Sequence, residues 1–229
     1  MSWAQRVAVF DTETTGVDPR EARVVTAFIG MLDGAGDLER GTDWLADPGV
    51  EIPEQASAVH GITTELAQAE GEPAAVVAAK IHAALSWIVR NRIPLVVYNA
   101  PYDLTLMAAE FRRHGLPPIE YGAQVIDPLV IDKAVDKYRR GKRTLDLVCE
   151  AYGVELFDAH DASADAVAAG HLALALARKY PGELDLRLEE VHAKQIVWAR
   201  MQAEDFQDYM RRERDPQFVA DCDWPLREI

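Results

Sequence analysis

The sequence has few cysteines and no long apolar segment, and each absence excludes a class of protein. Only two cysteines, Cys149 and Cys222, occur in 229 residues, so the chain does not depend on a disulfide framework. No apolar run approaches the roughly 18 residues that a membrane-spanning helix needs. The opening segment, MSWAQRVAVF, lacks the basic region and long apolar stretch of a signal peptide. We therefore expect a soluble, cytoplasmic protein without membrane contact.

Positive charge is also scarce. Lysine and arginine number 24 against 38 acidic residues, for a net charge of −14, whereas nucleic-acid-binding proteins usually carry a basic surface. Acidic residues that hold metal ions, however, belong to a site and do not form a repulsive surface. The basic residues are also unevenly spread, because residues 137–143, KYRRGKR, form a compact positive run. This run is either a solvated loop or a contact for phosphate groups.

The order of predicted elements indicates a mixed-sheet α/β domain. Alternating or continuous apolar residues predict strands, and apolar residues at helical spacing predict helices. Residues 6–16 are expected to form a strand and then a turn, with further strands near 23–33, 38–45 and 94–99. Residues 123–135 are expected to be a strand that enters a helix, and other helices are expected at 53–59, 73–90, 101–114, 144–152 and 161–180. Pro181 and Gly182 suggest a boundary between a domain of residues 1–180 and a C-terminal helical extension, 181–229. One long amphipathic helix is expected in this extension.

Two carboxylates lie at the end of the first predicted strand, in the segment VFDTETTG. Asp11 and Glu13 are two residues apart, so their side chains project from the same face of a strand. Two like charges held side by side are unfavourable unless a positive group lies between them. The spacing therefore suggests a bound cation.

Two further carboxylates occupy similar positions. Asp103 lies just inside the helix that follows the strand at residues 94–99, and Asp165 lies in an alanine-rich helix that Asp161 can cap. Ligand sites of α/β sheets form at such strand ends and early helix turns. Oxygen ligands favour Mg²⁺ or Mn²⁺, and two such ions would balance four carboxylates. His160 directly precedes this helix, where its ring can turn toward Asp165.

The ordered motifs resemble those of the DnaQ-like 3′–5′ exonucleases of the DEDDh type, which include the proofreading epsilon subunit of bacterial DNA polymerase III. The resemblance spans about residues 6–179 and rests on FDTETTG, IPEQASAVHGIT, YNAPYDLTLM, TLDLVCEAYGV and AHDASADA. It implies a ribonuclease H-like fold, a mixed sheet flanked by helices. It also implies removal of nucleotides from the 3′ end of DNA by two-metal hydrolysis, in proofreading or repair. The second motif differs from the usual one in having Tyr98 and Tyr102.

The resemblance assigns roles to particular residues. The metal ligands and catalytic carboxylates are Asp11, Glu13, Asp103 and Asp165, and the general base is His160. Histidine has a usual pKa near 6.5 and accepts a proton only when neutral, so the rate is expected to rise from about pH 6 to 8. Seven residues are candidates for binding the terminal nucleotide, namely Thr12, Thr14, Thr15, His60, Ile62, Asn99 and Tyr102. Of these, Ile62 and Tyr102 could equally be packing residues, and Asn99 could be a turn residue.

Other functions remain open at this point. An RNA 3′–5′ exonuclease of the ribonuclease T or oligoribonuclease type has the same fold and site. A non-catalytic nucleic-acid-binding module would be expected to lack one of the four acids or the histidine, all of which are present. The expected partner is a single-stranded or frayed 3′ end, of DNA by preference, and the C-terminal extension could bind a polymerase or another protein.

Overall fold

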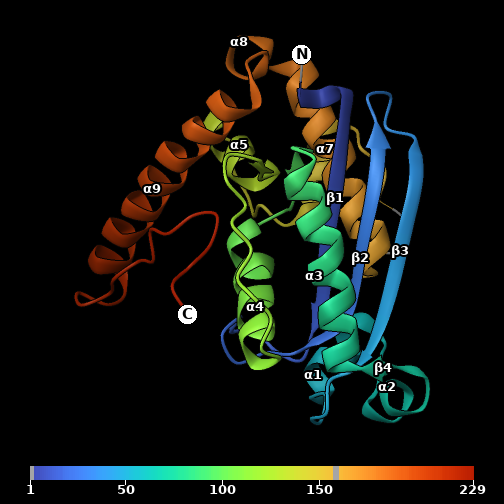
Figure 1. The fold of residues 1–229 in the computed structure, drawn as a ribbon. Helices are drawn as coiled ribbons and strands as arrows, with labels where there is room; N and C mark the ends of the chain where they lie inside the picture. The colour runs from blue at the N-terminus through green and yellow to red at the C-terminus, as the bar shows by residue number, and fades with distance from the viewer. Residues whose placement is uncertain (1–2, 157–159) are drawn as a thin grey trace.

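One mixed sheet of six strands organises the part of the chain that this computed structural model describes, residues 3–156 and 160–229. The strand order is β4-β3-β2-β1-β5-β6 (Figure 1). β1, β2 and β3 form an antiparallel meander, and β5 and β6 run parallel to β1. The bounds are β1 Arg6–Thr14, β2 Val24–Asp33, β3 Leu38–Asp47, β4 Glu72–Pro73, β5 Leu95–Val96 and β6 Val125–Ile126. The predicted α/β fold with a mixed sheet is confirmed.

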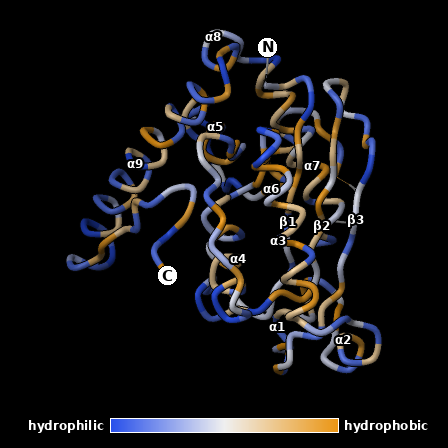
Figure 2. Tube along the Cα trace, viewed as in Figure 1, coloured by the Kyte–Doolittle hydropathy of each residue, from blue (hydrophilic) through white to orange (hydrophobic). Residues whose placement is uncertain are grey.

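Helices cover both faces of this sheet. α3 (Ala74–Arg90) and α4 (Ala100–Arg113) pack on one face, and α5 (Pro128–Val135), α6 (Leu145–Tyr152) and α7 (Ala162–Lys179) on the other. The alternation of β1 explains the two layers, because Ala8 and Phe10 belong to the first core and Val7 and Val9 to the second. Figure 2 shows the resulting hydrophobic stretches along β1, β2 and α4.

Two short helices follow the meander. α1 (Glu54–His60) ends at Gly61, whose φ of 77° is the left-handed conformation that glycine adopts without strain. α2 (Thr64–Glu70) was not predicted from the sequence, although Thr63 caps it by accepting a hydrogen bond from the backbone N–H of Leu66. Within the described residues, no helix has both the length and the apolar composition that crossing a bilayer requires.

α7 lies unusually close to the sheet because of Gly170. A Cβ atom at this position would lie 2.4 Å from Leu32 Cδ1 and 2.6 Å from Val9 Cγ1, distances that a real side chain does not tolerate. The helix can therefore sit directly on β1 and β2 only with glycine here. This close packing carries the first turn of α7, including Asp165, to the end of β1.

The long helix expected after Pro181 is present, but it begins later than predicted. The chain forms a short helix, α8 (Pro181–Leu184), and then a separate 26-residue helix, α9 (Leu188–Glu213). Leu184 and Leu188 are spaced as on one helix, but Leu184 is fully buried in the core beside α7, and the chain turns between them. α9 packs along α5 and β6, and the last residues return toward α4 (Figure 1).

Candidate active site

The end of β1 and the start of α4 converge because β1 and β5 are parallel neighbours. Val9 pairs with Val96, the last residue of β5, and the chain enters α4 four residues later at Ala100. Asp103, in the first turn of α4, is buried, and the Thr12 hydroxyl donates a hydrogen bond of 2.6 Å to its Oδ1. The topology thus brings Asp103 beside the strand that carries Asp11 and Glu13.

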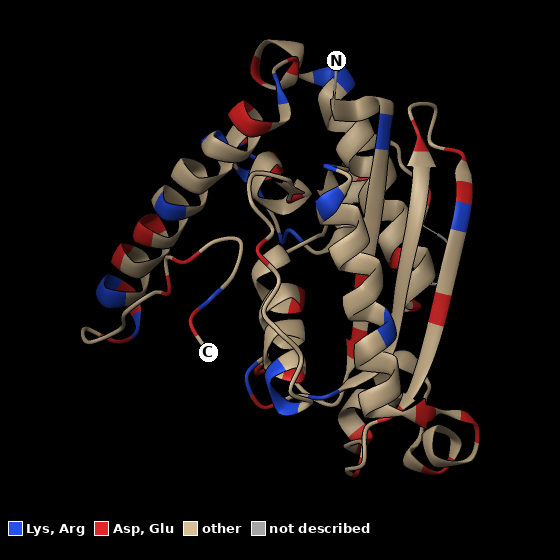
Figure 3. Ribbon diagram, in the orientation of Figure 1, with Lys and Arg blue, Asp and Glu red and all other residues tan. Residues whose placement is uncertain are grey.

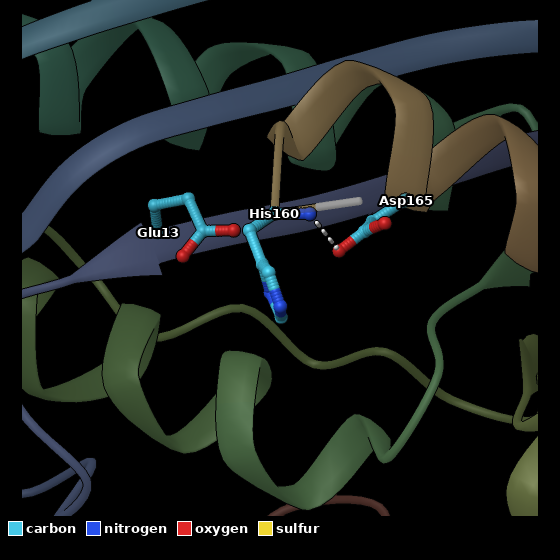
Figure 4. Close-up of side chains that lie close together, drawn as sticks. All are labelled: Glu13, His160 and Asp165. Atoms are coloured by element: carbon cyan, nitrogen blue, oxygen red, sulfur yellow. Dashed lines mark hydrogen bonds between the residues drawn. The ribbon is translucent and has the colours of Figure 1, made fainter. Parts of the chain in front are cut away.

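The start of α7 completes the cluster. Asp161 caps this helix by accepting hydrogen bonds from the backbone N–H groups of Ser163 and Ala164. His160 precedes the cap with a left-handed φ of 74°, and its N–H donates a 3.3 Å hydrogen bond to Asp165 Oδ2. Polar atoms of Glu13, His160 and Asp165 all lie within 4.8 Å of one another. Figure 4 shows His160 between Glu13 and Asp165, with its backbone N–H bonded to Asp165 and its ring extending past the two carboxylates. Ala159, the first residue of the motif AHDASADA, lies outside the described residues.

Burial raises the pKa of all four acids, and neighbouring site carboxylates raise those of Asp11 and Glu13 further. Burial raises the pKa of Glu13 to about 8, with further contributions from Asp165 and Asp103. Burial likewise raises the pKa of Asp103 to about 7. The pKa of Asp11 lies well above its usual range because of burial and then the charges of Asp103, Asp165 and Glu13. A metal-free site therefore holds protons at pH 7 in place of a full set of negative charges.

The donor set fits a divalent cation. Asp165 Oδ1 is buried and has no hydrogen-bond partner among the described residues, which is unfavourable for a carboxylate oxygen unless a cation or a proton balances it. The other donors within reach are carboxylate oxygens and one imidazole. Hard divalent ions such as Mg²⁺ and Mn²⁺ prefer carboxylate oxygens. Glu13 and Asp165 are placed to share one ion, with His160 beside them, and the ligand roles of Asp11 and Asp103 stay predictions.

The raised pKa values predict how stability depends on pH without metal. Between the ordinary carboxyl pKa values and about pH 8, the folded protein binds more protons than the unfolded chain, because Glu13 and Asp103 titrate at about 8 and 7. The free energy of unfolding should therefore fall as pH rises through this window. We expect the melting temperature in EDTA to drop by roughly 5 °C or more from pH 6 to pH 8.5. Differential scanning calorimetry measures it.

Metal binding should reverse this loss of stability. At pH 8.5, saturating Mg²⁺ or Mn²⁺ should restore the lost stability, since an ion that binds only the folded state stabilises it. The matched control is Glu13→Gln, which removes one of the raised groups and should flatten the pH dependence. A wild-type melting temperature in EDTA that stays constant or rises over this pH range would contradict the raised pKa values of Glu13 and Asp103.

Three of the predicted nucleotide-binding residues bond with the end of β1. The Thr14 hydroxyl lies 2.6 Å from the Tyr102 hydroxyl and donates to the carbonyl of Gly16 at 2.8 Å. Tyr102 also donates to the Gly16 carbonyl. The Thr15 hydroxyl accepts a 2.9 Å hydrogen bond from the backbone N–H of Arg23. Tyr102 and Thr14 thus lie at the site, whereas the Thr15 hydroxyl holds the start of β2.

The remaining predicted residues differ in how they are placed. His60 is half-buried, and burial lowers its pKa although the nearby backbone of Thr14, at the end of β1, partly offsets this. Its Nε2 is buried without a hydrogen-bond partner among the described residues. Ile62 is half-buried and packs on a small core of Val25, Ile52 and Ala67. Asn99 is exposed with a left-handed φ of 59°. Their roles in substrate binding stay predictions.

Asp127 is a residue that the sequence reasoning missed. Its carboxylate is fully buried and accepts 3.0 Å hydrogen bonds from the backbone N–H groups of Asn99, Ala100 and Leu129. It therefore caps α5 and also holds the residue pair that begins α4. The signal was present as Asp127-Pro128, an N-cap residue followed by the proline that favours the first helical position. The sequence did not show that Asp127 also binds the start of α4.

Comparisons with known proteins agree with this geometry. The RNase T exonuclease family model matches residues 8–173. A DNA polymerase III subunit epsilon-like protein of Rhodobacter capsulatus is 31% identical over 172 residues, which cover 73% of this chain and 23% of that protein. The DNA polymerase III subunit epsilon of Rickettsia conorii is 27% identical over 155 residues, covering 66% of this chain and 63% of that protein. The chain thus spans less than two thirds of either relative.

Solved structures show the same architecture. E. coli exonuclease I in complex with a dT13 oligonucleotide superposes with a TM-score of 0.66 and 24% identity, covering 79% of this chain and 43% of that one. At this identity the likeness concerns the fold, a ribonuclease H-like mixed sheet flanked by helices. The family model covers most of the chain, including all four carboxylates and His160. The chain belongs to the RNase T family of exonucleases.

Proposed function

We propose that this protein is a metal-dependent 3′–5′ exonuclease that removes nucleotides from single-stranded or frayed DNA ends, in proofreading or repair. The observation that carries the proposal is the meeting of Glu13, His160 and Asp165, with polar atoms within 4.8 Å of one another, beside Asp11 and Asp103, in a site where burial raises the pKa of all four carboxyl groups. DNA is favoured over RNA by the epsilon subunits among the relatives and by the oligonucleotide in the exonuclease I complex.

The mechanism assigns separate tasks to the residues of the site. Asp11, Glu13, Asp103 and Asp165 would hold two Mg²⁺ or Mn²⁺ ions. When bound, such ions lower the pKa of a water and stabilise the leaving oxygen. His160 accepts the proton of the attacking water at a ring nitrogen, which lies within reach of Glu13 and Asp165. Thr12 orients Asp103 through its 2.6 Å hydrogen bond.

The remaining candidates would grip the terminal nucleotide. The hydroxyls of Tyr102 and Thr14 lie 2.6 Å apart and both face the Gly16 carbonyl, so they are held together where they can contact the last sugar. His60 lies beside Thr14, where its ring can meet the last base. An unpaired, unstacked base is the form that such a pocket accepts, and this agrees with action on a single-stranded end.

Degradation of labelled strands tests the proposal. Single-stranded DNA, duplex DNA and RNA, each with a 5′ label, are incubated with Mg²⁺, Mn²⁺ or EDTA. The expected result is a ladder of products shortened from the 3′ end, absent in EDTA and absent for the Asp11→Asn protein. Internal cleavage, or products released from the labelled 5′ end, would overturn the proposal. RNA is the alternative substrate, since the family model carries the name of RNase T, and faster degradation of the RNA strand would replace DNA with RNA.

We infer that residues 181–229 brace a catalytic unit formed by residues 1–180. The side chain of Trp224 donates a 3.2 Å hydrogen bond to Asp127 Oδ2, and the Gln195 side chain accepts the backbone N–H of Asp127 at 2.7 Å. The backbone N–H of Arg227 bonds the Thr105 hydroxyl on α4 at 3.0 Å. The extension thus contacts α4 and the residue that holds its first turn.

This bracing predicts an effect of a remote substitution on turnover. Trp224→Phe keeps an aromatic ring against His192, whose ring centroid lies 4.9 Å away, but removes the N–H donated to Asp127. We expect kcat to fall about 3- to 10-fold with little change in KM, and stability to fall by about 1–3 kcal/mol. Steady-state kinetics and denaturant unfolding measure the two effects.

The matched control lies in the same segment. Phe218 packs on Phe206 at 5.5 Å between ring centroids, and its side chain has no group that can hydrogen-bond Asp127, so Phe218→Leu should lower stability without lowering kcat. If Trp224→Phe lowers stability and leaves kcat unchanged, the extension covers the domain without positioning Asp103.

A further inference from the structure

The basic turn, residues 137–143, contains five cations. Lys137 pairs with Asp205 at 3.0 Å, and the fold divides the other four into two sets. Arg139 and Arg143 both bind the fully buried Asp132, Arg139 through 2.6 and 2.7 Å hydrogen bonds and Arg143 through one of 2.5 Å. Arg143 also donates to the backbone carbonyls of Asp136 and Arg139. These two arginines are therefore structural, and they fix both sides of the turn on one buried carboxylate.

The tip of the turn has the opposite character. Tyr138 is 90% exposed, and Arg140 and Lys142 are exposed and form no ion pair with any residue that the structure describes. Gly141, between them, has a left-handed φ of 104° and open space around its Cα. Two free cations and one aromatic ring thus project from a turn whose base is held rigidly.

The turn is anchored at the edge of the active site. The Tyr98 hydroxyl donates a 2.7 Å hydrogen bond to the Arg143 carbonyl, and Tyr98 directly precedes the segment that enters α4 and carries Asp103. On the other side, the turn leads into α6, whose first turn contains Asp146. The pKa of Asp146 is lowered mainly by the Thr144 hydroxyl and also by His160, which lies within electrostatic reach.

We propose that the basic turn binds the nucleic-acid strand behind its 3′ terminus, with Arg140 and Lys142 against phosphates and Tyr138 against an unpaired base. The direction of the strand rests on the proposed function. The whole chain carries a net charge of −14, and acidic residues recur along α1, α2 and β3 (Figure 3), so a strand is drawn only to local groups of cations. Charges more than about 8 Å apart are screened at physiological salt, so local cations decide where a strand binds.

Binding of a single strand measures the contribution of the turn apart from catalysis. A fluorescent dT12 oligonucleotide is titrated with Asp11→Asn protein in EDTA, at several salt concentrations, with and without R140Q/K142Q. The double substitution should weaken binding about tenfold and reduce the slope of log K against log salt by about 1.4, since each phosphate contact on a single strand contributes about 0.7. The control R90Q/R92Q removes two exposed arginines near the opposite end of β5 and should leave both values unchanged.

The aromatic residue has its own pair of variants. Tyr138→Ala should weaken binding between about 5-fold and about 100-fold, the range for one base stacked on an aromatic ring. Tyr138→Phe keeps the ring and should bind as the parent protein does. Equal affinities and equal salt slopes for the parent protein and R140Q/K142Q would overturn the proposal.

A short substrate separates this proposal from the proposed function. The p-nitrophenyl ester of thymidine 5′-monophosphate has no upstream phosphates. The R140Q/K142Q variant of the otherwise native protein should therefore hydrolyse this ester with unchanged kcat, whereas the KM of the variant for dT12 should rise. A parallel loss on both substrates would mean that the turn acts only on folding, against the proposal. If the native protein cleaves neither substrate but its affinity for dT12 still depends on the turn, the exonuclease assignment fails and the binding surface stands.

Discussion

Replacing Asp11 by asparagine is expected to abolish nuclease activity and, at the same time, to raise the melting temperature of the metal-free protein. Asp11 is the residue whose pKa all three other site carboxylates raise, in addition to burial. An uncharged amide of the same shape removes this repulsion, whereas the loss of a ligand removes the cation on which the chemistry depends. The two effects have opposite signs, so a merely misfolded variant cannot produce both.

The size of each effect follows from its cause. A bound ion contributes several kcal/mol to transition-state stabilisation, so the rate should fall by roughly 10³-fold or more. Relief of the buried charge should raise the melting temperature in EDTA at pH 8.5 by roughly 3–8 °C. Calorimetric titration with Mn²⁺ should show weaker binding than in the native protein.

The control is a carboxylate of equal charge outside the site. Asp37 lies exposed in the turn between β2 and β3, so Asp37→Asn changes the net charge equally and should alter neither rate nor metal binding. Activity above a tenth of the native value for Asp11→Asn, or Mn²⁺ uptake equal to that of the native protein, would contradict the assignment of Asp11 as a ligand.

The parts of the site that the sequence predicted are those set by local periodicity. Asp11 and Glu13 share a face because a strand repeats every two residues, and His160 lies just before α7 because Asp161 is a good N-cap. The mixed sheet followed from strands that first succeed one another and then alternate with helices. Each of these inferences needs only neighbours along the chain, and the structure agrees with each.

The parts that the sequence did not predict depend on contacts between distant segments. Trp224 and Asp127 are 97 residues apart, and no spacing rule joins them. The sequence leaves open whether the basic turn is solvated or binds phosphate, because the number of charges does not show which of them are paired. In the structure, Arg139 and Arg143 are paired with the buried Asp132. The break between α8 and α9 escaped prediction because Leu184 and Leu188 keep helical spacing across it.

The second large effect is expected at His160, where two substitutions separate chemistry from backbone strain. Both His160→Asn and His160→Ala remove the ring that accepts the proton, so kcat should fall about 10²- to 10⁴-fold in each, with KM within about threefold. His160 has a φ of 74°, a conformation that asparagine adopts more readily than alanine. Only His160→Ala should therefore lose stability, by about 1 kcal/mol.

Metal binding distinguishes a base from a ligand at this position. The His160 ring lies close enough to Glu13 and Asp165 to share an ion with them, so the same residue could act in either way. If His160 acts as a base, it is not needed for metal binding. Calorimetry of His160→Asn should then give nearly native affinity for Mn²⁺, although turnover is lost. Affinity reduced as far as in Asp11→Asn would identify His160 as a ligand, and the proton would then need another acceptor in the site.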